Sequence, residues 1–496
     1  MTPQRETLAS ALDRVSTTIA HALAEAVPVY QHYTRLCEND QSWRESTEPT
    51  ALAEEDARRV RTEAGMYAAN LLVEQLRVQA RAAAERFPTV GVSGELLSPM
   101  PPSNDPYAIR DWWEDLSDSD RSMVMTRNPS WVGSTDGLPM RARHKANLRL
   151  LETELANRAH LVGDNGEPIP DLDEEDQRDL RGLLRLQQLF DPKFQDSVDL
   201  TTVTTPLQER FLYLLDARQY PLRIAIVLGD IDHADHVVVH VPGATTTVDL
   251  RLFREATWLS NLRSEAVRIL GGDTRRVAIL DWIGYQAPYD IARRRALGDS
   301  GASVLVPGEA SDDQYARAGA PYLIRCAEGV RAIVGPDVRL VASGHSYGAS
   351  VFGLALQETD VFDAAMVVGC PGMFVTSIDQ LKIPPNTLFA AVAPGDVVAL
   401  LNFFGIQVIQ IAGVQILAPV PRTTTYPGGQ RALLRLAVGH ETYYDLGSVS
   451  LHGLAGIVVG DMGRVKTTSL AWLSRITGMA SNATMPAIPI VVGSGG

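Results

Sequence analysis

From about residue 220 onward, the sequence alternates between two kinds of segment. One kind is a short apolar run rich in Val and Ile that ends in Gly, Pro or Asp, and the other is longer, with apolar residues at helical spacing. Strands buried on both faces of a parallel sheet have such continuous apolar runs, and helices connect them. The alternation therefore predicts an α/β fold with a mostly parallel central sheet. The runs are LRIAIVLGD (222–230), HVVVHVPG (236–243), RVAILDW (276–282), VRLVASG (338–344), AAMVVGCPG (364–372) and LFAAVAPGD (388–396).

The chain before this point is predicted to be mainly helical. Residues 7–27 and 51–87 have apolar residues three and four positions apart, and Pro, Gly and Ser are frequent in the linker 88–106 that follows. Residues 105–155 are interpreted as helix, loop and helix, and the helical pattern continues over 173–190. A chain of 496 residues is also long enough for more than one domain.

The motif G-x-S-x-G occurs once, at Gly344, Ser346 and Gly348, with a strand-like run before it and a helix-like segment after it. In that context the serine would lie in a strained turn at the carboxyl end of a strand, with its hydroxyl available as a nucleophile. Flanking glycines suit this turn because a Cβ would collide with the adjoining strand and helix. We therefore predict that Ser346 is a nucleophile; the alternative is a serine that only caps the next helix.

A nucleophilic serine needs a base, and the base needs an acid that orients it. The run LFAAVAPGD ends in Asp396, at the edge of the sheet where Ser346 is expected, and we predict that it is the acid. His440 lies in a predicted loop after an apolar run, and we predict that it is the base. The alternatives are Asp363 and Asp379 for the acid and His452, in a predicted helix, for the base.

The oxyanion that forms in acyl transfer needs two backbone N–H donors. Tyr347 directly follows the predicted nucleophile and would supply one of them. The loop after HVVVHVPG would supply the other, and we assign it to Ala244 or its neighbour because Gly243 lets the backbone approach closely. His345 is expected to be a packed or hydrogen-bonded side chain rather than a second base.

Charge and cysteine content argue against several other functions. Lys and Arg number 45 against 59 Asp and Glu, which gives a net charge of −14 and disfavours binding to a nucleic-acid backbone. Cys37, Cys326 and Cys370 are far apart and form no CxxC motif, so neither a disulfide framework nor a zinc site is indicated. The sequence implies no metal and no organic cofactor.

The first residues, MTPQRETLASALDRV, lack a basic segment followed by an apolar one. We therefore expect no secretory signal and a cytoplasmic location, with export without a cleaved signal as the alternative. The most apolar long run, residues 400–420, contains one Asn and three Gln, so we do not expect a membrane span there.

Several of these segments together resemble a known family. HADHVVVHVPGATTT, DWIGYQAP, GHSYGASVFGLAL, VVGCPG, PGDVV and GHETYYD are similar, in this order, to the α/β-hydrolase family catalogued as domain of unknown function 1023, a group of actinobacterial serine-hydrolase-like proteins. Residues 111–151 resemble the helical segment that often precedes that domain, and the resemblance covers about residues 105–460. It implies a serine-hydrolase site on Ser346, Asp396 and His440 but no particular substrate.

With the resemblance in place, we expect three parts: a helical N-terminal region (1–200), an α/β-hydrolase domain (201–465), and a helix end with an extended tail (466–496). The first 100 residues or so have no counterpart in the family pattern. The apolar run 400–420 is interpreted either as a lid or acyl-binding wall, or as a buried strand pair or oligomer contact, because periodicity does not separate these.

The leading hypothesis is a carboxylic-ester hydrolase that acts through an acyl-enzyme on a small-molecule or lipid ester. Thioesters and amides would use the same groups, and an ester is the simplest of these substrates. The alternative is a non-catalytic structural or assembly protein with an inherited hydrolase fold. Its N-terminal helical region would then contact a second copy or a helical partner.

Overall fold

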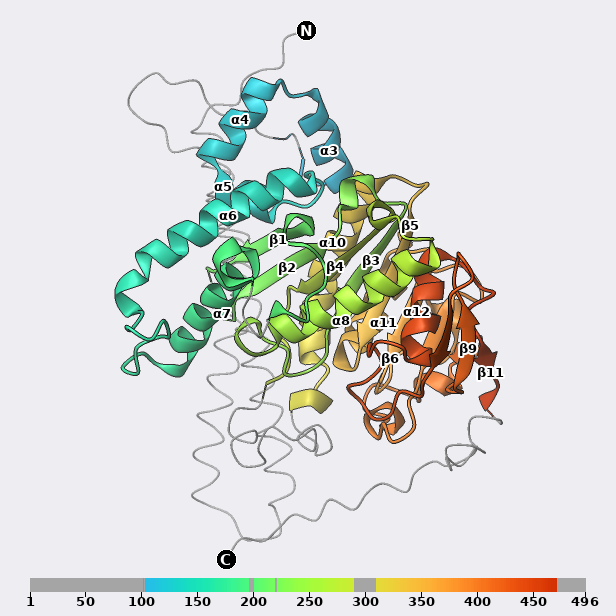
Figure 1. Cartoon of the computed structure of the whole chain (residues 1–496). Helices are drawn as coiled ribbons and strands as arrows, with labels where there is room; N and C mark the ends of the chain where they lie inside the picture. Colours follow the sequence, from blue (N-terminus) through green and yellow to red (C-terminus); the bar gives the residue numbers. More distant parts are fainter. Residues whose placement is uncertain (1–100, 102, 196–199, 219–220, 290–308, 471–496) are drawn as a thin grey trace, which may run out of the picture. The chain divides into compact units, whose positions relative to one another are not determined.

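The predicted apolar runs form the strands of a central sheet (Figure 1). The structure, a computed structural model, describes residues 101–470 except 102, 196–199, 219–220 and 290–308. β2 to β7 coincide with the six predicted runs. The strands are β1 (Arg210–Asp216), β2 (Arg223–Leu228), β3 (His236–Val241), β4 (Val277–Ile283), β5 (Arg339–His345), β6 (Ala364–Val368), β7 (Leu388–Ala391), β8 (Gln415–Leu417), β9 (Arg422–Thr425), β10 (Arg431–Leu434) and β11 (Thr467–Thr468).

Within the described residues, nine of these strands form one sheet in the order β1-β2-β4-β3-β5-β6-β7-β8-β11. All pairs within the stretch β4-β3-β5-β6-β7-β8 are parallel. The pairs β1–β2, β2–β4 and β8–β11, at the two edges, are antiparallel. β9 and β10 form a separate two-stranded sheet. The predicted α/β fold with a mostly parallel sheet is confirmed.

Helices cover both faces of this sheet, as the buried apolar runs require. On one face, Val239 of β3 packs in the same core as residues of α10 and α11; on the other, its neighbour Val238 packs with residues of α8 and α12 (Figure 1). The helices are α3 (Pro106–Asp115), α4 (Asp118–Arg127), α5 (Pro129–Ser134), α6 (Met140–Asn157), α7 (Glu174–Phe190), α8 (Val248–Ile269), α10 (Gln314–Val334), α11 (Tyr347–Glu358) and α12 (Val449–Val459).

The helical segment before the sheet packs directly on β1. Asn147 of α6 donates from Nδ2 to the Leu212 carbonyl over 3.2 Å, and the Leu212 N–H donates to His144 Nδ1 over 2.9 Å. The guanidinium of Arg143, 1% exposed, lies 3.7 Å from the centre of the Tyr213 ring. Helices α6 and α7 therefore belong to the same packed unit as the sheet.

Other sequence predictions concern residues that the structure does not describe. The helices predicted at 7–27 and 51–87, most of the linker 88–106, and residues 471–496 of the tail lie outside the described residues. Among the helices that are described, none is long and apolar enough to cross a membrane.

The apolar run 400–420 contributes part of its side chains to the core. Its residues 415–417 form β8, so this part is a buried strand between β7 and β11. Upstream of β8, Phe404 is 2% exposed, and its N–H donates to the Pro371 carbonyl over 3.3 Å. The Ile378 N–H donates to the Ala412 carbonyl over 2.9 Å, so the run is tied to the loop that follows β6.

The packing of α6 on β1 predicts the effect of one substitution. Arg143 donates to the Asp136 carboxylate over 2.9 Å and to the Gly133 carbonyl over 3.2 Å. Arg143→Leu should lower the free energy of unfolding by about 3 kcal/mol, because the Asp136 carboxylate loses its hydrogen-bond donor and the Gly133 carbonyl keeps only the one from Asn147. Guanidinium unfolding followed by circular dichroism and by tryptophan fluorescence measures the loss.

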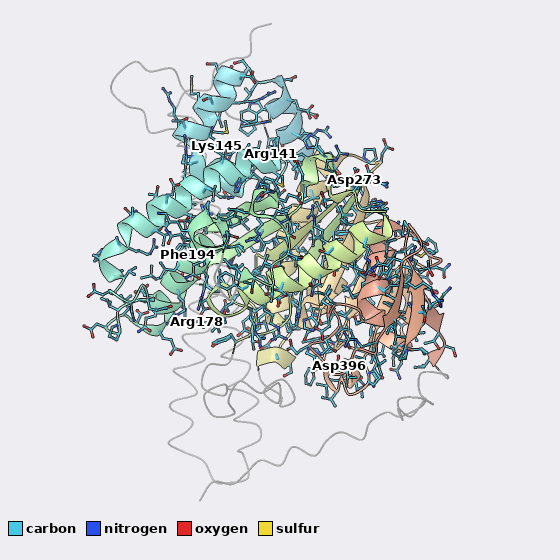
Figure 2. All side chains as sticks on the ribbon, viewed as in Figure 1. Arg141, Lys145, Arg178, Phe194, Asp273 and Asp396 are labelled. Carbon is cyan, nitrogen blue, oxygen red and sulfur yellow. The ribbon has the colours of Figure 1, made fainter. Side chains whose placement is uncertain are left out.

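Lys145→Ala is the matched control, because Lys145 is exposed on the same helix (Figure 2) and its loss should change stability by less than about 0.5 kcal/mol. In Arg143→Leu the two signals should shift together. A helical signal lost in an earlier, separate transition would contradict the assignment of α6 to the same unit as the sheet.

Candidate active site

Ser346 lies in the turn between β5 and α11 with a backbone conformation that residues other than glycine rarely adopt. Its φ is 53° and its ψ is −126°. The Ser346 N–H donates to the Val368 carbonyl at the end of β6 over 2.9 Å, which holds the turn against the neighbouring strand. The side chain makes no capping hydrogen bond to α11, so the helix-cap interpretation finds no support. A strained strand-to-helix turn is the backbone geometry of a nucleophile elbow.

The glycines on either side of Ser346 lie where a side chain does not fit. A Cβ on Gly344 would lie 2.5 Å from Ala349 Cα, and one on Gly348 would lie 2.1 Å from the Val241 carbonyl oxygen. Both distances are well below van der Waals contact, and the contacted atoms belong to the backbone. The packing therefore agrees with the expectation that a Cβ at either glycine of the motif would collide with the adjoining strand and helix.

The loops that follow four neighbouring parallel strands lie at one edge of the sheet. Ser346 follows β5, Gly243 follows β3, Gly369 follows β6 and Asp396 follows β7. Gly243 approaches the turn so closely that a Cβ on it would lie 2.7 Å from Ser346 Cβ. A Cβ on Gly369 would lie 2.7 Å from His440 Cε1 and 3.0 Å from Asp396 Oδ2. The backbone at Gly369, beside the turn that carries Ser346, thus contacts His440 and Asp396.

Asp396 and His440 form a hydrogen-bonded pair. His440 Nδ1 lies 3.0 Å from each carboxylate oxygen of Asp396. The Asp396 side chain is fully buried, whereas the His440 side chain is 15% exposed. The carboxylate can therefore hold the imidazole in the tautomer with a proton on Nδ1, which leaves Nε2 free to accept a proton.

Three further donors surround the Asp396 carboxylate. The N–H groups of Val398 and Ala399 donate to Oδ1 over 3.0 and 3.2 Å, and the Tyr443 hydroxyl donates to Oδ2 over 2.5 Å. Burial by itself would raise the pKa of Asp396, but the hydrogen bonds from His440 and Tyr443 outweigh it and lower the pKa below its ordinary value. Asp396 is therefore ionised at neutral pH.

His345 supports the backbone of His440. Its Nε2 lies 3.0 Å from the His440 carbonyl oxygen, and its ring stands edge-on to Trp258 with the centroids 5.5 Å apart. Burial, followed by the proximity of His440, lowers the pKa of His345 well below its ordinary value. It is a hydrogen-bonded, neutral side chain, as expected from the sequence.

The alternative acid and base residues have other partners. His452 lies between Glu265 Oε1, 2.5 Å from its Nδ1, and Thr424 Oγ1, 3.1 Å from its Nε2. Asp363 accepts from Arg331 and from the Leu340 N–H near the start of β5, at the opposite end of that strand from Ser346. Asp379 is exposed in a short 3-10 helix. The structure brings none of these residues next to the His440–Asp396 pair.

The two predicted oxyanion donors belong to segments next to Ser346. The Tyr347 N–H is in the first turn of α11 and has no acceptor within that helix. Its side chain is fixed, because the hydroxyl donates to the Asp312 carbonyl and accepts from the Ala316 N–H. Ala244 is in the loop after β3, next to Gly243, which contacts Ser346.

One contact of the predicted triad is not formed. In the described part of the chain, the structure has no hydrogen bond between Ser346 Oγ and His440. The two residues nevertheless lie in adjacent segments, since His345, directly before Ser346, has its ring centroid 4.8 Å from that of His440. Catalytic hydrogen bonds are often long in proteins without substrate and shorten when substrate binds.

The sequence did not indicate two features of the site. Tyr443 lies in the segment GHETYYD, but nothing in its spacing indicates that its hydroxyl reaches Asp396. Helix α8 also reaches the loop that carries His440: Arg254 forms an ion pair with Glu441, and Asn261 donates to the Tyr444 carbonyl over 3.1 Å. Such contacts between distant segments leave no local signal in a sequence.

The Tyr443 hydroxyl provides a test of the charge on Asp396. Tyr443→Phe should lower the free energy of unfolding at pH 7 by about 1–3 kcal/mol, because Asp396 and the Ala393 N–H both lose a partner. The pKa of Asp396 is lowered in the folded state, so its contribution to stability is present above its unfolded pKa and is lost as the pH falls through the folded pKa. The difference in the free energy of unfolding between wild type and variant should therefore become smaller below about pH 4. Urea unfolding over a pH series measures it.

Tyr213→Phe is the control. The Tyr213 hydroxyl is buried and has no hydrogen-bond partner among the described residues, so its removal should leave the pH dependence of stability unchanged. If the gap for Tyr443→Phe is the same at every pH, the hydroxyl does not stabilise a charged Asp396.

Comparison with known proteins gives a family match over part of the chain. Residues 216–405 match a family model described as "Alpha/beta hydrolase". An uncharacterized protein of Mycobacterium tuberculosis is 23% identical over 319 residues, which cover 61% of this chain and 45% of that protein. An uncharacterized protein of Mycobacterium bovis is 29% identical over 196 residues, which cover 38% of this chain and 67% of that protein. The chain thus spans about half the length of the first of these relatives.

Two similar solved structures are a hyperthermophilic esterase from Pyrobaculum calidifontis and a putative dienelactone hydrolase from Klebsiella pneumoniae. The esterase has 11% sequence identity and a TM-score of 0.28, with 64% of this chain and 98% of that chain covered. The second has 13% identity and a TM-score of 0.28, with 46% and 85% covered. The narrower family with domain of unknown function 1023 stays a prediction. The sheet order, the turn at Ser346 and the match over residues 216–405 together identify the fold of this chain as that of an α/β-hydrolase.

Proposed function

We propose that this chain is a serine hydrolase, and most simply a carboxylic-ester hydrolase with Ser346, His440 and Asp396 as its triad. The observation that carries the proposal is the strained turn at Ser346 beside a buried, ionised carboxylate that is hydrogen-bonded to an imidazole. These are the parts that acyl transfer requires. The helix-cap role and the alternative acids and bases have less support, because each alternative residue is engaged elsewhere.

In the proposed reaction, Ser346 Oγ attacks the carbonyl carbon of the ester while its proton passes to His440 Nε2. Asp396 keeps the other imidazole nitrogen protonated and stabilises the positive charge that forms on the ring. The N–H groups of Tyr347 and Ala244 would donate to the oxyanion. His440 then gives its proton to the leaving alcohol, and a water molecule, activated by the same imidazole, releases the acid from the acyl-enzyme.

A fluorophosphonate probe tests the nucleophile directly. Wild-type protein should be labelled, and Ser346→Ala should abolish labelling and lower kcat/KM for an activated ester by at least about 1000-fold. Ser350→Ala is the matched control, because Ser350 lies one turn further along α11 and its hydroxyl donates to the Gly372 carbonyl over 2.8 Å. It should keep both labelling and activity.

The same experiment separates the enzyme from the non-catalytic alternative. Folded wild-type protein that neither reacts with the probe nor hydrolyses any p-nitrophenyl ester would favour the structural or assembly role. Labelling that persists in Ser346→Ala would show that another residue is the nucleophile.

An aromatic group beside Tyr347 supports an apolar acyl-binding wall. The Phe404 ring stands edge-on to the Tyr347 ring, with the centroids 5.2 Å apart. Phe374, which has a φ of 61°, and Phe403 both contact Phe404. Phe403 and Phe404 belong to the run interpreted from the sequence as a lid or acyl wall. We therefore place the acyl chain of the substrate along this group.

Phe403 is only partly buried, so it can be shortened without opening the core. Phe403→Ala should lower kcat/KM for p-nitrophenyl octanoate about tenfold more than for the acetate, because only the longer chain reaches the lost apolar surface. Phe194→Ala, which shortens a partly buried phenylalanine of a different core cluster, should leave the ratio unchanged. An equal loss on both esters would argue against the acyl wall while leaving the serine chemistry intact.

A further inference from the structure

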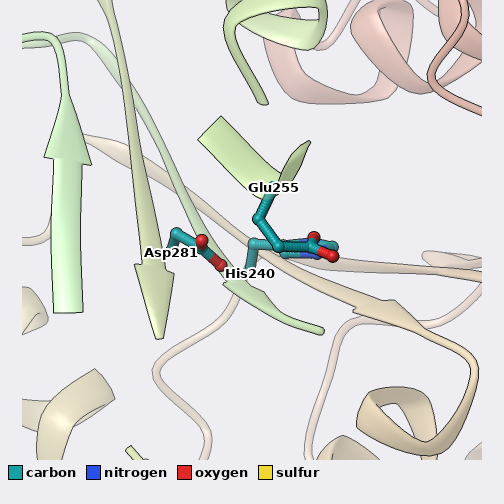
Figure 3. A group of neighbouring side chains, drawn as sticks. All are labelled: His240, Glu255 and Asp281. Atoms are coloured by element: carbon teal, nitrogen blue, oxygen red, sulfur yellow. The ribbon is translucent and has the colours of Figure 1, made fainter. Parts of the chain in front are cut away.

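Polar side chains form a row across three neighbouring strands near the centre of the sheet. Asp281 of β4 is directly paired with His240 of β3, and His240 with Ser343 of β5. Alternation along the strands places these residues on the face that is covered by α8. Glu255 of α8 extends toward Asp281 and His240 from the facing side (Figure 3). We call His240, Glu255 and Asp281 the buried triplet.

The buried triplet is closed to solvent, and four of its polar atoms lack hydrogen-bond partners among the described residues. His240 and Asp281 are 0% exposed, and Glu255 is 2% exposed. Among the described residues, no group pairs with His240 Nε2, with Glu255 Oε2 or with either carboxylate oxygen of Asp281. Burial of an unpaired polar atom is costly, and native structures contain few of them. Four such atoms in one place indicate a missing partner.

The spacing of these atoms suits an ion better than hydrogen bonds. His240 Nε2 lies 3.9 Å from Glu255 Oε2, which is too far for a hydrogen bond. One ligand atom from each of the three residues can be chosen so that all lie within 4.8 Å of one another. Ligands of a tetrahedral zinc ion lie about 3.4 Å apart, so small side-chain movements would complete the contact.

The histidine is oriented as a ligand would be. His240 Nδ1 lies 3.0 Å from Ser343 Oγ, which in turn lies 3.5 Å from the Tyr444 hydroxyl. When Nδ1–H donates to Ser343, the lone pair of Nε2 faces the two carboxyl groups. Metal-binding histidines are held in the same way, with the other ring nitrogen hydrogen-bonded to a second group.

The chemical types of the side chains in the triplet also suit a cation, because two carboxyl groups and one imidazole meet in a closed space. A divalent cation would balance two ionised carboxylates and give each unpaired atom a partner.

We propose that His240, Glu255 and Asp281 bind a divalent transition-metal ion, with Zn²⁺ the best fit, which ties α8 to β3 and β4. A nitrogen ligand beside two carboxylates suits zinc and disfavours magnesium and calcium, which prefer oxygen ligands only. Asp281 can supply two of the four bonds, because both of its oxygens are unpaired. The closed site makes the role structural, and the proposal does not depend on the hydrolase activity.

The metal content of the full chain tests the proposal. Protein expressed with added Zn²⁺ and then desalted should contain about one zinc per chain by elemental mass spectrometry. Glu255→Gln and Asp281→Asn keep the side-chain shapes but remove the charges, and each should reduce the content to below about a tenth of that value.

Glu265→Gln is the matched control. Glu265 is a buried carboxylate on α8, the helix that carries Glu255. It also lies beside a histidine, but it is already paired, with His452 and with the Tyr426 hydroxyl. This variant should keep its zinc even if its stability falls. Zinc that remains in Glu255→Gln and Asp281→Asn would lie at another site and would overturn the proposal.

Stability gives a second measurement. Wild-type protein refolded with Zn²⁺ should melt at least about 5 °C higher than protein refolded with a chelator, and the two triplet variants should show no such difference. The metal content of the wild type is decisive even if the variants do not fold. Wild-type protein that contains no metal under any of these conditions would overturn the proposal.

Discussion

The parallel pairing of β3, β5, β6 and β7 is the constraint on which the other features depend. Parallel neighbours end at the same edge of a sheet, so the loops that carry Gly243, Ser346, Gly369 and Asp396 meet there without any long connection. The register matters as much as the order, because a shift by one residue would turn every side chain to the opposite face. The alignment of Asp281, His240 and Ser343 across three strands depends on the same register.

Helix α8 contacts both the buried triplet and the residues around His440 in the candidate site. Its Glu255 faces His240 of β3 and Asp281 of β4. On the same helix, Trp258 contacts His345, and Arg254 pairs with Glu441 next to His440. A single rigid helix therefore positions the buried triplet and the loop of the proposed base. Changes that displace α8 are expected to act on both regions together, even though the two regions have different chemistry.

The sequence predicted the parts of the fold that leave a local pattern. Strands β2 to β7 are continuous apolar runs that end in Gly, Pro or Asp, and the loops with Ser346 and Asp396 follow from their order, whereas His440 lies after β10. β1, with the sequence RFLYLLD, was not among the predicted strands, because the run ends in no Gly or Pro and was not separated from the helical half of the chain. The hydrogen bond from Tyr443 to Asp396 was also missed, because side chains on distant segments share no spacing rule. The buried triplet comes from three separate elements for the same reason, and no metal motif was visible.

The place of β1 has a practical consequence for work on shortened versions of the chain. The matched family region begins at residue 216, where β1 ends. A chain cut there would lose the strand that pairs with β2 and the helices that cover Ile224 and Ile226. β2 would become an exposed sheet edge with unpaired backbone groups, which is a template for aggregation. Boundaries drawn from family similarity would therefore yield an insoluble fragment, whereas a cut before α3 would leave the sheet capped.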